Sequence, residues 1–363
     1  MSDADHMAHA LRIAARGLGH VWPNPAVGCV LVKSGLIVGR GWTQSGGRPH
    51  AETMALAQAG AAANGATGFV TLEPCAHHGH TPPCADALIA AGVVRVVTAL
   101  TDPDPRVAGR GHARLSAAGI DVTENVLADQ ARYVNAGFLK RLTQGLPFVT
   151  LKLATTLDGR IATSTGQSRW ITGPDARRAV HLMRLTHDAV MIGAGTARAD
   201  DPDLTVRDLG AARQPVRIVL DSRLSHDPVS RLGQTARDTP VWMVHTAAAS
   251  PTMQNAWRAQ GAELIPVAGD VSGQIDLTAA LQALGNKGLT RILCEGGGTI
   301  AAALIRARLI DDIAQFSAGA LMGGDGQAAV GPLGITQLSD APRLKLRETR
   351  QIGADCFSLW SCA

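Results

Sequence analysis

The feature that most constrains the fold is the alternation of short apolar runs with helical segments along the chain. An amphipathic helix is expected over 3–19, because Met7, Leu11 and Leu18 recur at helical spacing. After it we expect a β-hairpin (28–32 with 36–39), a helix (50–63) and a strand (69–72). A helix that opens at Pro82 and Pro83 and a strand over 93–100 are expected next. Strands that alternate with helices predict a largely parallel α/β sandwich.

A second α/β alternation begins near residue 147. Its strands are expected near 148–154, 189–193, 216–220, 241–245, 263–267 and 290–295, with helices between several of them. The segment 144–147 has the composition of a turn, and the length of 363 residues suits two domains of roughly 100–200 residues each. No internal repeat links the halves, so we expect separate domains over 1–146 and 147–363.

Composition argues against several classes of function. The net charge of +4 is scattered along the chain, and only 3% of the residues are aromatic, which disfavours a nucleic-acid binder. The sequence lacks an apolar run of about 18 residues or more, as a membrane helix would need. Its start lacks the basic and apolar regions of a signal peptide. We therefore expect a cytoplasmic protein that binds neither nucleic acid nor membranes.

The strongest chemical signal lies in the first half. His50, Cys75 and Cys84 form a nitrogen-and-sulfur donor set that suits tetrahedral Zn²⁺ and leaves a fourth position for water. Glu52 follows His50 by two residues and could carry a proton from that water to a leaving amine. This arrangement is similar to the zinc deaminase signature, except that nine positions rather than three separate the cysteines. For the remaining cysteines, burial is the expectation; they are Cys29, Cys294, Cys356 and Cys362.

Other interpretations of these residues remain open. A closed structural zinc site would need no free acid, so Glu52 argues against it. Between the two cysteines, His77 is an expected substrate contact, with a merely solvated loop residue as the alternative. A zinc-stabilised binding protein without turnover is a further alternative.

Glycines mark the most informative loop of the second half. The segment 296–301 (Gly-Gly-Gly-Thr-Ile-Ala) follows an expected strand and opens an expected helix, where backbone N–H groups can approach a phosphate. It satisfies the pattern G-x-G-x-x-A. A doubly wound dinucleotide domain is nevertheless not predicted, because the loop lies near the C-terminus and no acidic residue ends a following strand about 20 positions on.

Three segments of the first half resemble the deaminase half of the bifunctional riboflavin-biosynthesis family. They are 24–28 (Asn-Pro-Ala-Val-Gly), 49–52 (Pro-His-Ala-Glu) and 73–84, which carries the long spacing between two cysteines. The resemblance implies a cytidine-deaminase-like three-layer sandwich, zinc on His50, Cys75 and Cys84, and Glu52 as the proton shuttle. It also implies that Asn24 meets the pyrimidine and that Thr81 helps to hold the ribose phosphate.

Two positions near the expected phosphate site depart from this family. Thr43 stands where the family commonly has His, and His80 where it commonly has Arg or Lys. A protonated His80 could partly replace the missing cation and make substrate binding depend on pH.

The second half resembles the reductase half of the same family, which is similar to dihydrofolate reductase in fold. The resemblance implies NADPH as hydride donor, bound by Ala154, Trp170, Thr196, Asp200, Ser222 and a loop that includes Gly297, Gly298 and Thr299. It implies substrate contacts from Ser168, Arg184, Leu204, Arg207 and Glu295. Arginine pairs bidentately with phosphate, so Arg184 and Arg207 suit a phosphate clamp. Lys152 and Asp200 are the candidates for polar catalysis, and Lys152 could polarise the carbonyl oxygen or supply its proton.

The resemblance as a whole implies two consecutive reactions. The first would be hydrolytic deamination of 2,5-diamino-6-ribosylamino-4(3H)-pyrimidinone 5′-phosphate, and the second would be reduction of the ribosyl side chain to ribityl. The implied partner is this phosphorylated pyrimidine, and a homo-oligomer through the reductase domain is expected. The alternative is a zinc nucleoside or RNA base deaminase with an accessory domain.

Overall fold

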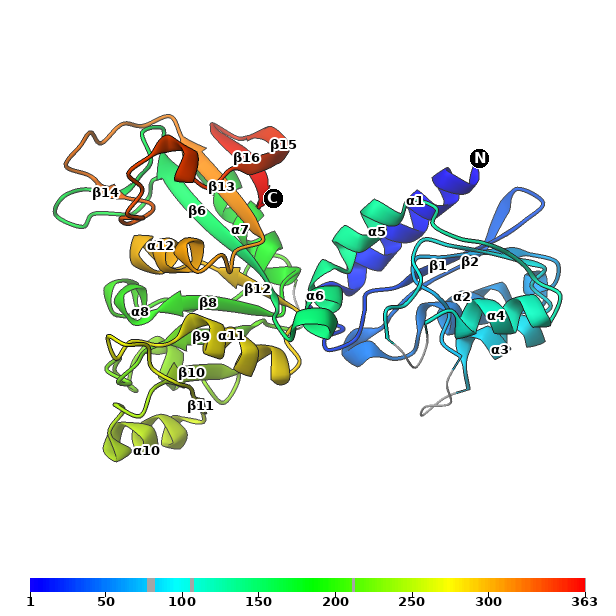
Figure 1. Cartoon of the computed structure of the whole chain (residues 1–363), viewed down its shortest axis with the longest axis horizontal. Helices are drawn as coiled ribbons and strands as arrows, with labels where there is room; N and C mark the ends of the chain where they lie inside the picture. The colour runs from blue at the N-terminus through cyan, green and yellow to red at the C-terminus, as the bar shows by residue number, and fades with distance from the viewer. Residues whose placement is uncertain (77–81, 105–107, 211–212, 363) are drawn as a thin grey trace. The chain divides into compact units, whose positions relative to one another are not determined.

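The structure is a computed structural model that describes residues 1–76, 82–104, 108–210 and 213–362. The chain divides into two compact units, Met1–Gly145 and Leu146–Ala363 (Figure 1). Within the described ranges, no helix combines the length and the apolar character that crossing a membrane requires. Three residues singled out from the sequence, His77, His80 and Thr81, lie outside the described residues.

The first unit is built on one five-stranded sheet in the order β2-β1-β3-β4-β5. Its strands are β1 (Gly28–Lys33), β2 (Leu36–Trp42), β3 (Thr67–Val70), β4 (Arg95–Thr98) and β5 (Asp121–Thr123). The helices are α1 (Asp3–Ala14), α2 (Ala51–Ala59), α3 (Cys84–Ala90), α4 (Arg110–Ala117), α5 (Ala128–Val134) and α6 (Ala136–Gln144). The pairs β2–β1 and β1–β3 are antiparallel, whereas β3, β4 and β5 run parallel, so this sheet is mixed rather than largely parallel.

Helices cover both faces of this sheet. In Figure 1, α1 and α5 lie on one face, and α2, α3 and α4 lie on the other. Two glycines mark how closely the layers approach: a Cβ on Gly28 would lie 2.1 Å from a backbone oxygen of α1, and a Cβ on Gly41 would lie 2.1 Å from one of α2. The three-layer sandwich expected for the first half is therefore confirmed.

The first helix shows why local sequence and structure agree here. The Ser2 hydroxyl accepts a hydrogen bond from the Asp5 N–H at 3.2 Å, and the Asp5 carboxylate accepts one from the Ser2 N–H at 2.8 Å. This reciprocal pair satisfies N–H groups that a helix start leaves without an intrahelical partner. The helix ends at Ala14, and a 3₁₀ turn over Ala15–Gly17 continues it, so the expected end at 19 is too late.

The second unit holds a nine-stranded sheet in the order β11-β10-β9-β8-β12-β6-β13-β16-β15. Its strands are β6 (Phe148–Thr156), β8 (Ala189–Gly193), β9 (Val216–Leu220), β10 (Val241–His245), β11 (Glu263–Pro266), β12 (Arg291–Cys294), β13 (Asp312–Ala318), β15 (Leu344–Ile352) and β16 (Asp355–Cys362). A separate two-stranded sheet pairs β7 (Arg160–Ala162) with β14 (Gln327–Ala328). All pairs of the large sheet are parallel except β13–β16 and β15–β16.

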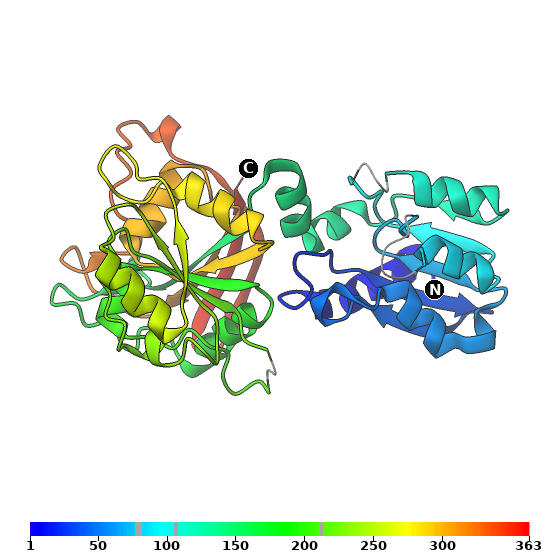
Figure 2. The same cartoon turned by 90° about the horizontal axis from the view of Figure 1, so that it is seen from below.

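Helices also lie on both faces of the large, twisted sheet (Figure 2). They are α7 (Pro174–Leu185), α8 (Ala194–Asp200), α9 (Arg231–Gln234), α10 (Pro251–Gln260), α11 (Leu277–Asn286) and α12 (Gly298–Arg306). Each strand predicted between 148 and 295 is present within two residues of its expected bounds.

The C-terminal hairpin of β15 and β16 was not predicted, because its outer strand lacks an apolar pattern. Seven of the nine residues of β15 are exposed. The hairpin also corrects the expectation that the four remaining cysteines are buried: Cys29 and Cys294 are buried, whereas Cys356 and Cys362 lie in β16 and are exposed.

Candidate functional sites: a metal centre and a large cavity

Three possible metal ligands meet in the first unit. The ligand atoms of His50, Cys75 and Cys84 all lie within 4.8 Å of one another. His50 Nδ1 is 3.3 Å from Cys84 Sγ and 3.8 Å from Cys75 Sγ. Tetrahedral zinc with bonds of about 2.0–2.3 Å places such donor atoms roughly 3.5 Å apart, so the geometry of the donor set fits the ion.

Two helix starts hold these ligands in place. His50 is the N-cap residue of α2, which can approach β2 closely because a Cβ on Gly39 would lie 2.2 Å from the Ala55 carbonyl oxygen. Cys84 opens α3, and its backbone N–H donates to Cys75 Sγ at 3.3 Å. Hydrogen bonding from Cys84 lowers the pKa of Cys75 to about 4, which favours the thiolate that binds a metal.

Glu52 stands beside the three ligands without belonging to the cluster. It lies in the first turn of α2 and is only 4% exposed. Burial raises the pKa of Glu52, and the neighbouring Cys75 adds to this effect. A buried acid that can hold a proton next to an open metal position suits proton transfer.

Glu73, two residues before Cys75, stabilises a loop and a helix start through hydrogen bonds that could not be predicted from the sequence. Its buried carboxylate accepts hydrogen bonds from the backbone N–H groups of Asp102, Gly109, Gly111 and His112 at 2.8–3.3 Å. These donors lie in the loop before α4 and in its first turn. Glu73 therefore ties the chain just before the metal ligand Cys75 to the start of α4.

Glu73→Gln should destabilise the first unit by about 2–3 kcal/mol, because one carboxylate oxygen becomes an amide group that cannot accept from the N–H donors facing it. Denaturant unfolding measures this loss. As a control, Asp129→Asn removes a carboxylate that is 98% exposed and should change the free energy of unfolding by less than about 0.5 kcal/mol. Equal stability of the two variants would contradict the role of Glu73.

Two further residues of the first unit lie in loops at the edge of the sheet. Asn24 Nδ2 donates to the Val21 carbonyl oxygen at 3.3 Å, and the Asn24 side chain packs against Gly47, three residues before His50. Thr43 is buried, and its hydroxyl accepts from the Val27 N–H at 3.0 Å. The Thr43 side chain thus connects the residue after β2 to the residue before β1 and is not exposed to solvent.

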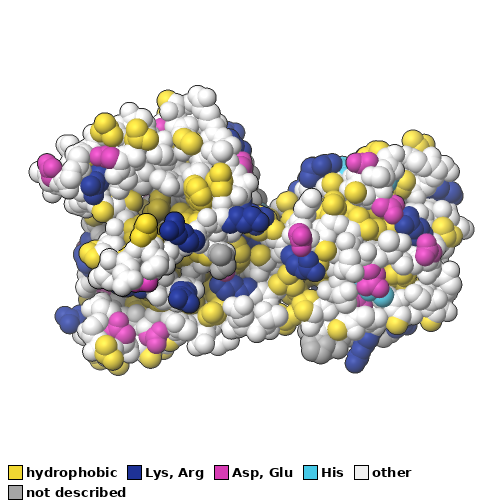
Figure 3. All heavy atoms as spheres, turned by 45° about the horizontal axis from the view of Figure 1, so that its top comes forward, with side chains coloured by type: hydrophobic (Ala, Val, Ile, Leu, Met, Phe, Trp, Pro, Cys, Tyr) yellow, Lys and Arg dark blue, Asp and Glu magenta, His cyan; other side chains and the backbone are white. Residues whose placement is uncertain are grey.

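The second unit contains a cavity of about 1480 Å³. Every residue of the second half that was singled out from the sequence lines it: Lys152, Ala154, Ser168, Trp170, Arg184, Thr196, Asp200, Leu204, Arg207, Ser222, Glu295, Gly297, Gly298 and Thr299. Small-molecule pockets usually measure about 300–1,000 Å³, so this one has room for two ligands. Figure 3 shows Lys and Arg side chains gathered around a hollow on one face of this unit.

The glycine loop enters this cavity as expected. Gly297 is the N-cap residue of α12, directly after β12, and its N–H donates to the Thr196 hydroxyl on α8 at 3.2 Å. The first N–H groups of a helix have no acceptor within the helix. Gly298 and Thr299, the first residues of α12, line the cavity, and N–H groups at a helix start suit a phosphate.

A buried cluster of charges lies at another part of the wall. Arg184 donates to both carboxylate oxygens of Glu295, at 2.6 and 3.0 Å, and to the Thr205 carbonyl oxygen at 2.8 Å. Lys152 Nζ lies 4.0 Å from Glu295. These contacts use three of the five N–H bonds of Arg184, so its guanidinium positions Glu295 and keeps two N–H bonds for a further acceptor.

The cluster shifts the pKa values of its members. Burial alone would raise the pKa of Glu295, but the charge of Arg184, its hydrogen bonds and Lys152 hold this pKa at about 2. Burial lowers the pKa of Lys152. Glu295 is therefore ionised at neutral pH and cannot serve there as a proton donor.

Glu295→Gln should remove a pH-dependent part of the stability of the second unit. Because the pKa of Glu295 is lower in the folded chain than its ordinary value near 4.5, the carboxylate contributes about 3 kcal/mol above pH 4.5. This contribution is lost as the pH falls towards 2. The difference in free energy of unfolding between the wild type and the variant should shrink over that window, as urea unfolding at several pH values can measure. An unchanged difference would contradict this, and the exposed Glu263→Gln is the control.

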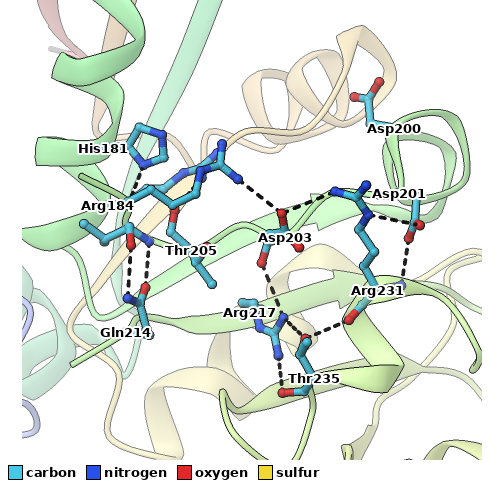
Figure 4. A network of polar contacts seen from close by, with 12 residues as sticks. His181, Arg184, Asp200, Asp201, Asp203, Thr205, Gln214, Arg217, Arg231 and Thr235 are labelled. Atoms are coloured by element: carbon cyan, nitrogen blue, oxygen red, sulfur yellow. Dashed lines mark hydrogen bonds and ion pairs between the residues drawn. The ribbon is translucent and has the colours of Figure 1, made fainter. Parts of the chain in front are cut away.

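Sequence reasoning missed a polar network beside the cavity (Figure 4). Asp203 Oδ2 lies 3.2 Å from the Arg207 guanidinium and 3.5 Å from the Arg231 guanidinium. Arg207, the other arginine expected to bind phosphate, thus has a carboxylate partner, and its side chain is half exposed. Arg217, fully buried in β9, donates to the Asp203 carbonyl oxygen at 3.4 Å and to Thr235 at 2.7 Å. A lone arginine in the otherwise apolar run 216–220 was the available signal.

Asp200 is separate from that network in Figure 4. Its carboxylate lies 3.9 Å from the Arg169 guanidinium, and its side chain is 40% exposed. Asp200 lines the cavity, where its charge interacts with both Arg169 and Lys152.

Comparison with known proteins adds to this geometry. The cytidine and deoxycytidylate deaminase zinc-binding region matches residues 1–100, and the RibD C-terminal domain matches residues 147–358. The second match speaks against an unrelated accessory domain in the second half.

Relatives match over nearly the whole chain. The riboflavin biosynthesis protein RibD of Escherichia coli is 45% identical over 99% of both chains, and that of Haemophilus influenzae is 44% identical over 97% of this chain and 95% of its own.

Solved structures agree with this. RibD from Acinetobacter baumannii is 37% identical with a TM-score of 0.88, and the deaminase/reductase from Thermotoga maritima is 33% identical with a TM-score of 0.86. Each alignment covers 99% of both chains. The chain therefore belongs to the RibD family, and it is a bifunctional enzyme of riboflavin biosynthesis that joins a zinc-dependent deaminase to a reductase that uses NADPH.

Proposed function

We propose that residues 1–146 catalyse the deamination and residues 147–363 the reduction. The metal ligand cluster, contained within the first unit, and the large cavity, lined by residues of the second, support this division. The Thermotoga maritima relative is described as a diaminohydroxyphosphoribosylaminopyrimidine deaminase and a 5-amino-6-(5-phosphoribosylamino)uracil reductase. We propose the same two phosphorylated pyrimidines as substrates of this chain.

In the deaminase site, His50, Cys75 and Cys84 would hold zinc, which when bound would lower the pKa of a water molecule enough to supply hydroxide near neutral pH. Glu52 would take the proton of that water and pass it to the leaving amine. Asn24, His77 and Thr81 would hold the substrate. The observation that carries this assignment is the buried carboxylate of Glu52 beside a set of three ligands.

In the reductase site, NADPH when bound supplies the hydride. Lys152 would polarise the carbonyl oxygen of the open ribose chain and provide its proton, and Asp200 would orient the same region. Ser168, Arg184, Leu204, Arg207 and Glu295 would surround the substrate, with Arg184 acting mainly through Glu295. The cofactor would contact the remaining predicted residues of the cavity wall: Ala154, Trp170, Thr196, Ser222, Gly297, Gly298 and Thr299.

One experiment tests both assignments. The diamino substrate is supplied with and without NADPH, while ammonia release and NADPH oxidation are followed separately. We expect ammonia in both cases and NADPH oxidation only after deamination. Deamination that persists without zinc, or oxidation that does not need the deaminated product, would contradict the proposal.

We also propose a cytoplasmic location and a homo-oligomer that forms through the reductase domain. Within the described residues, Cys29, Cys75, Cys84, Cys294 and Cys356 form no disulfide, which suits a reducing compartment. The exposed strand β15 forms one edge of the nine-stranded sheet, and an edge strand can pair with a strand of a second copy. Light scattering of the full chain measures the mass of the assembly.

A further inference from the structure

One wall of the large cavity is a loop without regular secondary structure, residues 201–207, which follows α8. Leu204 and Arg207, two expected substrate contacts, belong to it. Leu204 has a φ of 56°, in the left-handed region that a residue with a bulky side chain rarely adopts. Such a conformation persists only where the surroundings impose it. The loop therefore depends on contacts that hold it in one arrangement.

Side chains, rather than backbone groups, hold this loop (Figure 4). Among the residues that the structure describes, no backbone group of 203–207 bonds another backbone group. Instead, the Gln214 amide accepts from the Val206 N–H at 2.6 Å and donates to the Val206 carbonyl oxygen at 3.1 Å. His181 Nδ1 accepts from the Arg207 N–H at 3.2 Å. The loop is thus fixed from two directions, by His181 on α7 and by Gln214 just before β9.

His181 can accept this hydrogen bond only while its imidazole is neutral. Burial lowers the pKa of His181, and the charges of Arg184 and Arg207 lower it further, so the neutral ring prevails at pH 7. Because Nδ1 is the acceptor, the ring hydrogen of the neutral form is on Nε2. The bond that fixes the Arg207 backbone is therefore available at neutral pH.

The remaining polar contacts of the loop complete this arrangement. The Arg207 guanidinium lies 3.2 Å from Asp203 Oδ2, so the side chain of Arg207 is directed as well as its backbone. The Asp203 carbonyl oxygen accepts from the buried Arg217 at 3.4 Å. The Thr205 carbonyl oxygen accepts from Arg184 at 2.8 Å. Arg207 therefore extends from a fixed backbone in a fixed direction.

We propose that His181 and Gln214 are positioning residues of the reductase site, which fix the backbone of the loop so that Arg207 meets the phosphate of the substrate. This inference rests on the proposed function, because it requires Arg207 to contact the substrate. Gln214 lies outside the cavity lining and so acts through the loop. His181 belongs to the lining, so its test has to separate an action through Arg207 from a direct contact.

Steady-state reduction by the full chain tests the proposal. Each protein first deaminates the diamino substrate without NADPH until ammonia release ends, and NADPH is then added. His181→Leu and Gln214→Met should each raise KM for the deaminated pyrimidine about tenfold, with kcat, KM for NADPH and the rate of ammonia release within about twofold of the wild type. The reason is that the phosphate lies at the opposite end of the sugar chain from the reacting carbonyl, so binding lost there appears in KM.

Two further comparisons distinguish positioning from a general loss of packing. His181→Asn has nearly the shape of His181→Leu but keeps an oxygen acceptor, so its KM should stay within about threefold of the wild type. In a chain that already carries Arg207→Gln, His181→Leu and Gln214→Met should raise KM by less than about twofold, because residues that act through the same group are not additive.

The control is Gln254→Met, which removes a hydrogen bond to the Ala249 carbonyl oxygen outside the cavity lining and should change neither KM nor kcat. Thermal unfolding shows whether each variant is folded, and Gln214→Met makes the comparison without any change at His181. Variants that keep the wild-type KM, or whose effects multiply with that of Arg207→Gln, would overturn the inference. A wild type that does not oxidise NADPH with the deaminated pyrimidine would overturn the proposed function of the second unit instead.

Discussion

Replacing Glu52 by glutamine should abolish ammonia release while zinc stays bound. The amide has nearly the shape of the carboxylate but cannot take a proton, and the ligand set of His50, Cys75 and Cys84 is unchanged. General acid–base groups contribute roughly 10²–10⁴-fold to a rate, and Glu52 would handle more than one proton, so a loss of at least about a thousandfold is expected. An ammonia assay measures the rate, and elemental analysis measures the zinc.

Two companion variants sharpen this test. Cys75→Ser should lose zinc as well as activity, since it removes a ligand, whereas Asp129→Asn should retain both. If Glu52→Gln still released ammonia at the normal rate with zinc bound, the proton would have to travel through another group.

Replacing Lys152 by methionine should reduce NADPH oxidation by about 10²–10³-fold and leave deamination unchanged. Methionine has a similar length but can neither polarise a carbonyl oxygen nor donate a proton. The variant should fold, because the buried carboxylate of Glu295 keeps its paired hydrogen bonds from Arg184. Stopped-flow absorbance of NADPH measures the reduction.

The control for this variant is Lys287→Met, which removes an ammonium group of the same unit that binds the half-exposed Glu263 outside the cavity lining. It should leave the rate of reduction unchanged. A normal rate in Lys152→Met would exclude this lysine from the reaction and leave Asp200 as the candidate. Loss of deamination in the same variant would argue against independent sites.

The cluster of His50, Cys75 and Cys84 could be predicted from the sequence because short segments with clear boundaries carry these residues. His50 and Cys84 stand at helix starts, where proline or a change of pattern marks the boundary, so spacing along the chain translates directly into position. The strand near 189–193 was equally predictable, since a buried parallel strand is a continuous apolar run.

What the sequence did not predict depends on contacts between distant segments. Glu73 and the N–H of Gly111 are 38 positions apart, and Arg184 and Glu295 are 111 positions apart. Only the folded sheet brings such pairs together, so the ion pair of Arg184 with Glu295 could not be predicted from spacing along the chain. The exposed strand β15 lacked a pattern for a different reason, because side chains that face solvent are free to vary.

The close approach of α2 to β2 fixes the positions of two chemically different side chains, His50 and Glu52, at the start of the same helix. His50 and Glu52 lie within one turn, so any displacement of the helix moves them together relative to Cys75 and Cys84. A side chain introduced at Gly39 or Gly41 would force such a displacement. Metal affinity and turnover would then decline in parallel. A substitution at either glycine of β2 would therefore affect both the metal ligand His50 and the acid Glu52 through one displacement of α2.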